Sequence, residues 1–225
     1  MYKLGRLPDG DLVATTATSG LVRIAPSGSI STVVPGLRAY GLAVHPSGAV
    51  FAATNYTAGT DGIVRIDPAT GDWELVEPLP ATPRDIAFGP GFGTLYIGTT
   101  DGGAVLALRL DAQGEPTGPA AHLLDVPAAW HDTVEVDACG NLYVGSVFST
   151  SIFRVRAADG SVQEVLDWPP GFNGPYGHGL QWGEGPWSDR SIFVAHPYVG
   201  SRVTEWAIGV PGARWPGTAL GAAEL

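Results

Sequence analysis

The chain repeats one pattern of apolar and polar positions about every 45 residues. An apolar strand runs into a turn rich in Gly, Pro, Asp or Asn, and a second apolar strand returns from that turn. The clearest copy is residues 131–145, HDTVEVDACGNLYVG. Five copies align on the apolar residue that precedes the turn: Leu4, Leu42, Ile86, Val134 and Leu180. These residues lie 38 to 48 positions apart.

Further segments extend each copy. A third apolar segment follows every pair, and in the first four copies a fourth segment led by glycine comes next. Four short strands per unit, at this period, are typical of β-propeller blades. We therefore predict an all-β fold, a single β-propeller domain over residues 1–225 made of four-stranded antiparallel blades. The predicted blades are 2–39, 40–81, 82–129, 130–175 and 176–217, with a C-terminal tail over 218–225.

Ring closure is the open question of this prediction. The sequence begins almost directly on the innermost strand of its first blade, and the fifth copy lacks a clear fourth strand. Propellers usually close when one terminus completes the blade of the other, which protects the sheet edges. Two rings remain under consideration, one with five blades and one with six that has lost an N-terminal blade.

Composition narrows the classes of function. With 32 Gly, 19 Pro and 15% charged residues, the chain suits short strands and tight turns. A formal net charge of -10 argues against a nucleic-acid partner. Cys139 is the only cysteine, which excludes an intrachain disulfide. Lys3 is the only lysine, and with the Ala, Gly and Pro usage this is typical of a GC-rich bacterial genome.

Location and assembly are less constrained. No apolar run reaches the roughly 18 residues of a membrane helix, so we expect no membrane partner. The stretch MYKLGRLPDGD lacks the apolar core of a signal peptide. We expect a cytoplasmic protein from the sequence as it stands, or a periplasmic or extracellular one if a leader is missing. Nothing in the sequence indicates an oligomeric state.

Propeller topology brings one set of polar residues to one face. The residues that enter the innermost strands share this upper face with the loops that join the second and third strands of each blade. We expect it to bind a small molecule, because loops on a rigid scaffold usually carry function. The residues expected there are Tyr40, Arg84, Asp85, His131, Asp132 and His178 from the inner strands, and Asn55, Phe148, His196 and Tyr198 from the loops.

Individual residues in this region allow more than one interpretation. Asp132 either contributes to a functional site or pairs with Arg84. His178 lies between two glycines and is expected to be functional. Glu135 and Gln181 occupy one register on adjacent inner strands, and we expect hydrogen bonds inside the channel because a buried carboxylate needs a partner.

The repeat units resemble those of a known superfamily. GLAVHPSGAVFAAT with GIVRIDPATG, and DTVEVDACGNLYVGS with SIFRVRAADGSV, are similar to the blades of the gluconolactonase / senescence marker protein (regucalcin) superfamily. They also resemble the NHL-type and virginiamycin B lyase propellers. The resemblance covers nearly the whole chain.

The resemblance implies a divalent cation, often calcium, at the mouth of the channel. In that superfamily the cation is held by a Glu of the first blade and by Asn or Asp residues just before the later inner strands. The matching positions here hold Tyr40, Arg84, Asp132 and His178, and only Asp132 fits the pattern. Calcium prefers about 6–8 oxygen ligands. Asp132 with His178 as metal ligands would suit zinc or manganese better.

Three functions are considered. The first is a metal-dependent hydrolase of a small lactone or ester, with Asp132 as ligand and His178 as base or second ligand. The second is a non-catalytic propeller that binds a ligand or a protein on its upper face. The third is a lyase of the virginiamycin B type, in which His178 and Asp132 would abstract a proton.

Overall fold

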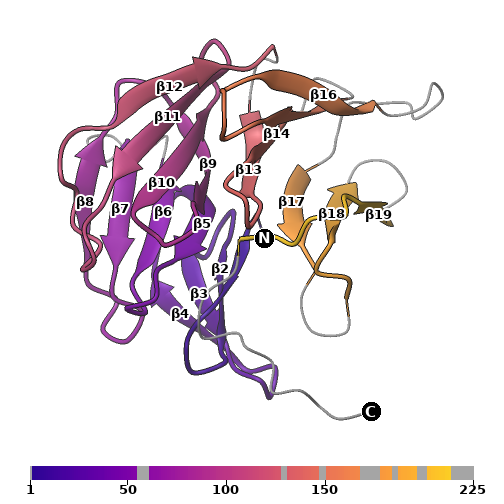
Figure 1. The fold of residues 1–225 in the computed structure, drawn as a ribbon. Coiled ribbons are helices and arrows are strands. Elements are labelled where there is room, and N and C mark those ends of the chain that lie inside the picture. The colour runs from indigo at the N-terminus through magenta and orange to yellow at the C-terminus, as the bar shows by residue number, and fades with distance from the viewer. Residues whose placement is uncertain are drawn as a thin grey trace.

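The structure is a computed structural model, and it describes residues 2–54, 61–127, 131–146, 151–167, 178–183, 187–196 and 202–213. The propeller prediction is confirmed, because five antiparallel sheets stand around a common centre with their first strands innermost (Figure 1). The described residues contain no helix. In the part of the chain that the structure describes, no helix is therefore available to span a membrane.

Each blade is a meander of consecutive strands. Blade 1 contains β1 (Leu4–Arg6), β2 (Leu12–Thr15), β3 (Leu21–Ile24) and β4 (Ile30–Val34). Blade 2 contains β5 (Ala39–Val44), β6 (Val50–Thr54), β7 (Gly62–Ile66) and β8 (Trp73–Pro78). Blade 3 contains β9 (Pro83–Phe88), β10 (Thr94–Thr99), β11 (Ala104–Arg109) and β12 (Ala121–Asp125).

The last two blades differ in strand number. Blade 4 contains β13 (His131–Val136), β14 (Leu142–Ser146), β15 (Ser151–Val155) and β16 (Val162–Asp167). Blade 5 contains β17 (His178–Trp182), β18 (Ser191–His196) and β19 (Arg202–Ala207). Within the described residues blade 5 is thus three-stranded, which agrees with the weak fourth segment of the fifth repeat.

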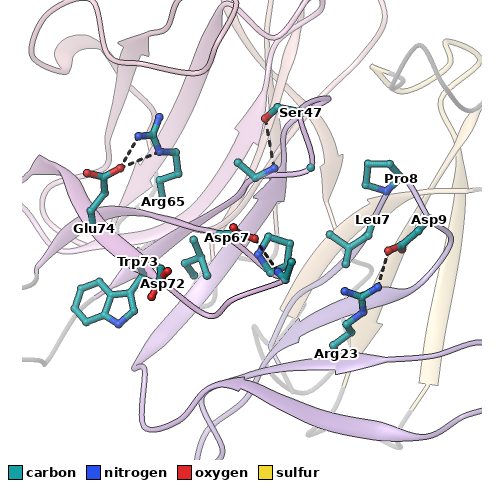
Figure 2. A pocket seen from close by; sticks show the side chains of 15 residues that line it. Leu7, Pro8, Asp9, Arg23, Ser47, Arg65, Asp67, Asp72, Trp73 and Glu74 are labelled. Carbon is teal, nitrogen blue, oxygen red and sulfur yellow. Dashed lines mark hydrogen bonds and ion pairs between the residues drawn. The ribbon is translucent and has the colours of Figure 1, made fainter.

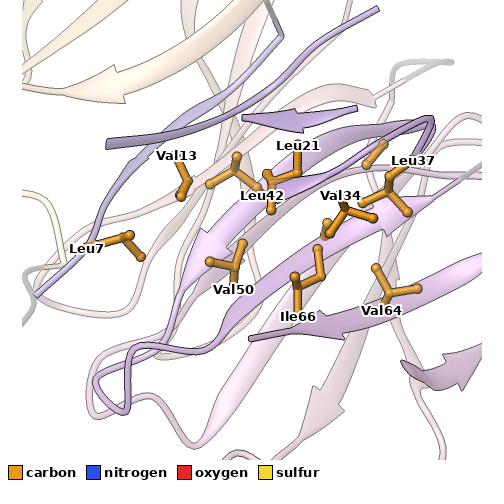
Figure 3. Close-up of a cluster of buried hydrophobic side chains, with 11 residues drawn as sticks. Leu7, Val13, Leu21, Val34, Leu37, Leu42, Val50, Val64 and Ile66 are labelled. Atoms are coloured by element: carbon orange, nitrogen blue, oxygen red, sulfur yellow. The ribbon is translucent and has the colours of Figure 1, made fainter. Parts of the chain in front are cut away.

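The core lies between the blades rather than inside one of them. Figure 3 shows the cluster between blades 1 and 2, where Leu21 of β3 and Leu42 of β5 belong to the same group of buried side chains. Side chains alternate across each sheet, so from blade 1 to blade 5 one face of each blade packs against the next blade along the chain. Full burial of one such leucine contributes about 1.5–3 kcal/mol.

A β-bulge interrupts the inner strands at one recurring position. In β9 the register shifts around Arg84, and in β13 it shifts around Asp132. A similar shift occurs in β5 between Ala39 and Leu42. Bulges re-aim side chains and are frequent beside functional sites. In each of these strands the bulge lies at the residue two positions before the aligned apolar residue. It directs that residue toward the end of the channel, which we call the channel mouth.

The turn of the clearest repeat is held by one buried carboxylate. Asp137 accepts hydrogen bonds from the backbone N–H groups of Cys139 and Asn141, each at 2.9 Å. It also accepts from the Asn141 side-chain amide at 2.7 Å and from the Tyr143 hydroxyl at 3.2 Å. Burial and the Asp137 carboxylate together raise the pKa of Tyr143. Asp137 therefore has a structural role, on the face opposite the mouth.

Candidate functional site at the channel mouth

A continuous row of side chains crosses the channel mouth, one from each of the first four blades. The rings of Tyr2 and Tyr40 have centroids 4.5 Å apart at an interplanar angle of 43°. The Arg84 guanidinium carbon lies 3.6 Å from the centroid of the Tyr40 ring. Arg84 Nε then donates to Asp132 Oδ1 at 2.8 Å. All four stand two residues before the aligned apolar residue of their blade, so we call them the mouth positions.

The ion pair in this row is shielded from water. The side chains of Arg84 and Asp132 are 15% and 6% exposed. Partial burial would lower the pKa of Arg84, but the Asp132 carboxylate outweighs it and raises that pKa. A desolvated guanidinium also interacts more strongly with an aromatic face. Arg84 therefore stays charged, and the pairing of Asp132 with Arg84 that the sequence suggested is present.

A second charged group fills the channel below the mouth. Lys3 Nζ donates to Asp85 Oδ2 and to Glu135 Oε1, each at 2.9 Å. Asp85 Oδ2 also accepts the backbone N–H of Val134 at 2.9 Å. Lys3 comes from blade 1, whereas the two carboxylates come from blades 3 and 4. The hydrogen-bonding partner predicted for Glu135 inside the channel is thus the single lysine of the chain.

Lys3 keeps its proton in this position. Burial alone would lower the pKa of Lys3, but the charges and hydrogen bonds of Asp85 and Glu135 outweigh that effect and raise it. The side chain is only 9% exposed. A lysine in this state cannot act as a base or nucleophile, because both roles need the neutral amine. It can act as a fixed positive charge.

The polypeptide around Lys3 is tied to the neighbouring blade. The backbone N–H of Lys3 donates to Thr15 Oγ1 at 3.2 Å, and the Thr15 hydroxyl donates to the carbonyl of Tyr40 at 2.6 Å. Thr15 is fully buried. These bonds connect the Tyr2–Lys3 segment to the strand that carries Tyr40.

The remaining predicted residues are distributed unevenly. Asp85 lies inside the channel rather than at its surface. His131 is completely buried in β13, next to Gly98 of the preceding blade, so its ring does not line the mouth. The expectation that His131 contacts a ligand directly stays a prediction.

The side chains of the other predicted site residues lie outside the described part of the structure. Asn55, Phe148 and Tyr198 lie outside the described residues. His178 and His196 are placed only by their strands: the backbone of His178 pairs with Ala195 and that of His196 with Arg202. His178 therefore occupies the mouth position of blade 5, and its side chain lies outside the described part.

The described carboxylates around the mouth already have cationic partners within the protein. Among the described residues, no three His, Cys, Asp or Glu side chains gather as a metal site would require. Asp132 is paired with Arg84, and Asp85 and Glu135 are paired with Lys3. A metal here would have to displace or repel a buried cation, which is costly at low dielectric. The predicted metal ligation by Asp132 and His178 stays a prediction.

Sequence reasoning missed Tyr2 and Lys3. Their signal is the alignment of Tyr2-Lys3-Leu4 with Tyr40-Gly41-Leu42, which gives blade 1 a mouth position of its own. The sole lysine of an acidic chain, placed one residue after that position, was the further hint.

A cleft of about 760 Å³ lies on the opposite face, between the lower turns of blades 1 and 2 (Figure 2). Its ion pairs are less shielded from water than those of the mouth: Arg23 lies 2.5 Å from Asp9, and Arg65 lies 2.5 Å from Glu74. Exposed pairs of this kind contribute about 0–1 kcal/mol. We therefore place the candidate site at the mouth, where the charged groups are buried and converge from several blades.

The comparisons with known proteins agree with this fold. No family model and no curated protein matches the sequence. Among solved structures, a gluconolactonase from Xanthomonas campestris has a TM-score of 0.72 at 18% identity, over 93% of this chain and 71% of that one. A calcium-binding protein, regucalcin, from Agrobacterium tumefaciens has a TM-score of 0.70 at 20% identity, over 93% and 76%. Virginiamycin B lyase from Staphylococcus aureus has a TM-score of 0.59 at 19% identity, over 92% and 69%.

These similarities define a class of structure. The chain has the β-propeller fold shared by gluconolactonases, regucalcin and virginiamycin B lyase, and the resemblance predicted from the repeats is confirmed at the level of the fold.

Proposed function

We propose that this propeller binds a small cyclic molecule at its channel mouth and does so without a divalent metal. The observation that carries the proposal is the Lys3 ammonium, which Asp85 and Glu135 hold inside the channel at 2.9 Å each. A fixed protein cation already binds there the two carboxylates that a metal would otherwise need as ligands.

Recognition would use the aromatic part of the row. Tyr2 is 44% exposed and its ring contacts the ring of Tyr40, whose own face is covered by the Arg84 guanidinium. An exposed tyrosine ring held in place by a second ring offers a flat apolar surface at small entropic cost. The face of a sugar ring or a lactone fits such a surface. Since a similar solved structure is that of a gluconolactonase, glucono-lactone is the first molecule to test.

Calorimetric titration of the EDTA-treated protein with freshly dissolved glucono-lactone tests this proposal. Replacing Tyr2 with alanine removes a stacking surface of about 0.5–1.5 kcal/mol, so Kd should rise by up to roughly tenfold. Trp73→Ala is the matched control, because Trp73 is 41% exposed and lines the cleft on the opposite face. If Trp73→Ala weakens binding and Tyr2→Ala does not, the ligand occupies the lower cleft and the proposal fails.

A metal-dependent lactone or ester hydrolase is the second candidate, and the likeness in fold to gluconolactonases favours it. In this case adding calcium, zinc or manganese would start the hydrolysis of glucono-lactone. Titration of the released acid would measure its rate. Asp132→Ala would abolish that activity, because Asp132 is the carboxylate at the matching mouth position. Hydrolysis adds water to the product, so mass spectrometry separates it from a lyase, which would release an unsaturated product instead.

A further inference from the structure

Three blades carry an arginine at the same position of the third strand. They are Arg23 in β3, Arg65 in β7 and Arg154 in β15. Each of them pairs with the second residue of the strand before it. Because this register is shared, the three side chains should have equivalent surroundings near the lower turns, on the face opposite the mouth.

Two of these arginines are each held by two carboxylates. The partners of Arg23 are Asp9 and Asp11, and those of Arg65 are Glu74 and Glu115. Arg23 donates to each of its two partners at 2.5 Å. A guanidinium suits this position because its fork of N–H donors matches the oxygens of a carboxylate.

Arg154 has no such partner. Its Nε is buried without an acceptor, and within the described residues its guanidinium forms no hydrogen bond or ion pair. The turn of blade 4 holds Cys139 where the turn of blade 1 holds Asp9. It also holds Asn141 where the turn of blade 1 holds Asp11. Both carboxylates that bind the arginine of blade 1 are therefore replaced in blade 4 by side chains without a carboxylate.

The fourth strand of blade 4 differs in the same way. Gln163 of β16 lies opposite Arg154 in the strand pair, whereas Glu74 of β8 lies opposite Arg65. A neutral amide thus stands where blade 2 has a charged acceptor. At three positions where the other blades supply a carboxylate to their arginine, blade 4 supplies none.

The buried carboxylate of the blade 4 turn is already saturated with donors. Asp137 Oδ1 accepts from the backbone N–H groups of Cys139 and Asn141. Asp137 Oδ2 accepts from the Asn141 side-chain amide and from the Tyr143 hydroxyl. A carboxylate offers about four lone-pair sites, so Asp137 has none left for Arg154.

A second buried donor without an acceptor lies in the interface between blades 4 and 5. Trp182 of β17 is 6% exposed, and its Nε1–H has no acceptor among the described residues. Its ring meets that of Tyr143 edge-on, with centroids 5.4 Å apart. Burial and Asp137 raise the pKa of Tyr143, and the guanidinium of its strand partner Arg154 opposes that rise. Two donors without acceptors therefore lie beside one side chain, although buried donors are normally paired.

We infer that Arg154 and Trp182 bind the carboxylate group of a small molecule on the face opposite the mouth. The carboxylate would take the place that Asp9 has in blade 1, and it would enter from solvent past Cys139, which is exposed. A singly charged carboxylate fits better than a phosphate dianion, because Asp137 already places one negative charge in this turn. This inference does not depend on the ligand at the mouth.

NMR of the tryptophan indole N–H groups tests the inference. The native protein is titrated with sodium acetate in exchange for sodium chloride at constant ionic strength. The Trp182 signal is identified by its loss in Trp182→Phe. We expect the indole proton of Trp182 to move downfield and to saturate, because it gains a charged acceptor. Acetate should also raise the melting temperature, since the site exists only in the folded chain.

Two variants remove the site in opposite ways. Arg154→Met removes the cation and should weaken acetate binding by roughly tenfold or more, as expected when a hydrogen bond to a charged group is lost. Cys139→Asp supplies the carboxylate that blade 1 has, so it should abolish the acetate response and raise the melting temperature by itself. It keeps every buried side chain, so it tests the inference even if Arg154→Met does not fold.

Each variant has a matched control that should keep the acetate response. Arg156→Met removes an exposed arginine two residues further along the chain. Cys139→Asn changes the same residue as Cys139→Asp to a side chain of similar size without the charge.

Three results would overturn the inference. The first is a Trp182 signal that acetate does not move in the native protein. The second is an acetate response that survives unchanged in Arg154→Met or in Cys139→Asp. The third is tighter binding of inorganic phosphate than of acetate, which would show that the site does not select a carboxylate.

Discussion

Replacing Lys3 with methionine should destabilise the protein more than any other single loss of a charge at the mouth. Methionine keeps the length of the side chain and removes the ammonium, which leaves Asp85 and Glu135 without their shared cation. The side chains of Asp85 and Glu135 are 3% and 12% exposed, so water cannot replace the lost partner. Removing one partner from a buried ion pair costs about 3–5 kcal/mol. For a domain of this size that lowers the melting temperature by roughly 6–20 °C.

Chemical and thermal unfolding followed by circular dichroism at neutral pH would measure this loss. Arg38→Met is the matched control, because it makes the same change in net charge at an exposed position and should leave the melting temperature nearly unchanged. The triple variant Lys3→Met, Asp85→Asn, Glu135→Gln removes all three charges and should recover much of the stability. A loss below about 1 kcal/mol in Lys3→Met, the size expected of an exposed pair, would refute the buried-triad reasoning.

The pH dependence of the same variant gives an independent check. Burial already raises the pKa of Asp85, and in the native protein the Lys3 cation opposes that rise. Without Lys3 the folded variant should bind protons more readily than its unfolded chain does. Its stability should therefore increase as the pH falls from 7 toward 5, the reverse of ordinary acid denaturation. In the native protein the pKa of Asp85 is raised as well, but Lys3 limits that rise, so the increase should have the same sign, be smaller and begin at lower pH.

Two further predictions concern the opposite face. Asp137→Ala leaves several buried donors of the turn without an acceptor and should cost about 3 kcal/mol in denaturant unfolding, whereas Asp67→Ala, which removes one exposed turn contact, should cost far less. His45 is buried against Phe51 and Phe88, and this burial lowers its pKa. The unfolded chain therefore binds a proton more readily, so stability should fall as the pH drops below about 6.5, and His45→Phe should reduce that slope; an unchanged slope would contradict this.

The fold could be predicted from the sequence because its signal is periodic. The aligned apolar residues, from Leu4 to Leu180, repeat once per blade, and the residues around them repeat with them. The same periodicity predicted that Tyr40, Arg84 and Asp132 would lie on one face, because they hold equivalent positions in the repeat. In the structure, bulges recur at these points of the inner strands.

The charged centre of the channel could not be predicted in the same way. Lys3 is separated from Asp85 by 82 residues and from Glu135 by 132, and their contact depends on the geometry of the ring rather than on any local pattern. The burial of His131 was also missed, because whether it or Asp132 points toward the mouth depends on which residue the bulge leaves unpaired. The repeat also predicts that Leu4 is buried like the aligned residues of the other blades, but Leu4 is 44% exposed.

The measurement that tests the central claim most directly is the metal content of the purified protein, combined with its melting temperature. If Lys3 occupies the two carboxylates of the channel, the isolated protein should carry far less than one calcium, zinc or manganese ion per chain. Adding any of these ions should leave the melting temperature unchanged in the native protein. Stoichiometric metal that disappears in Asp132→Ala, or a clear rise in melting temperature on adding calcium, would contradict this account.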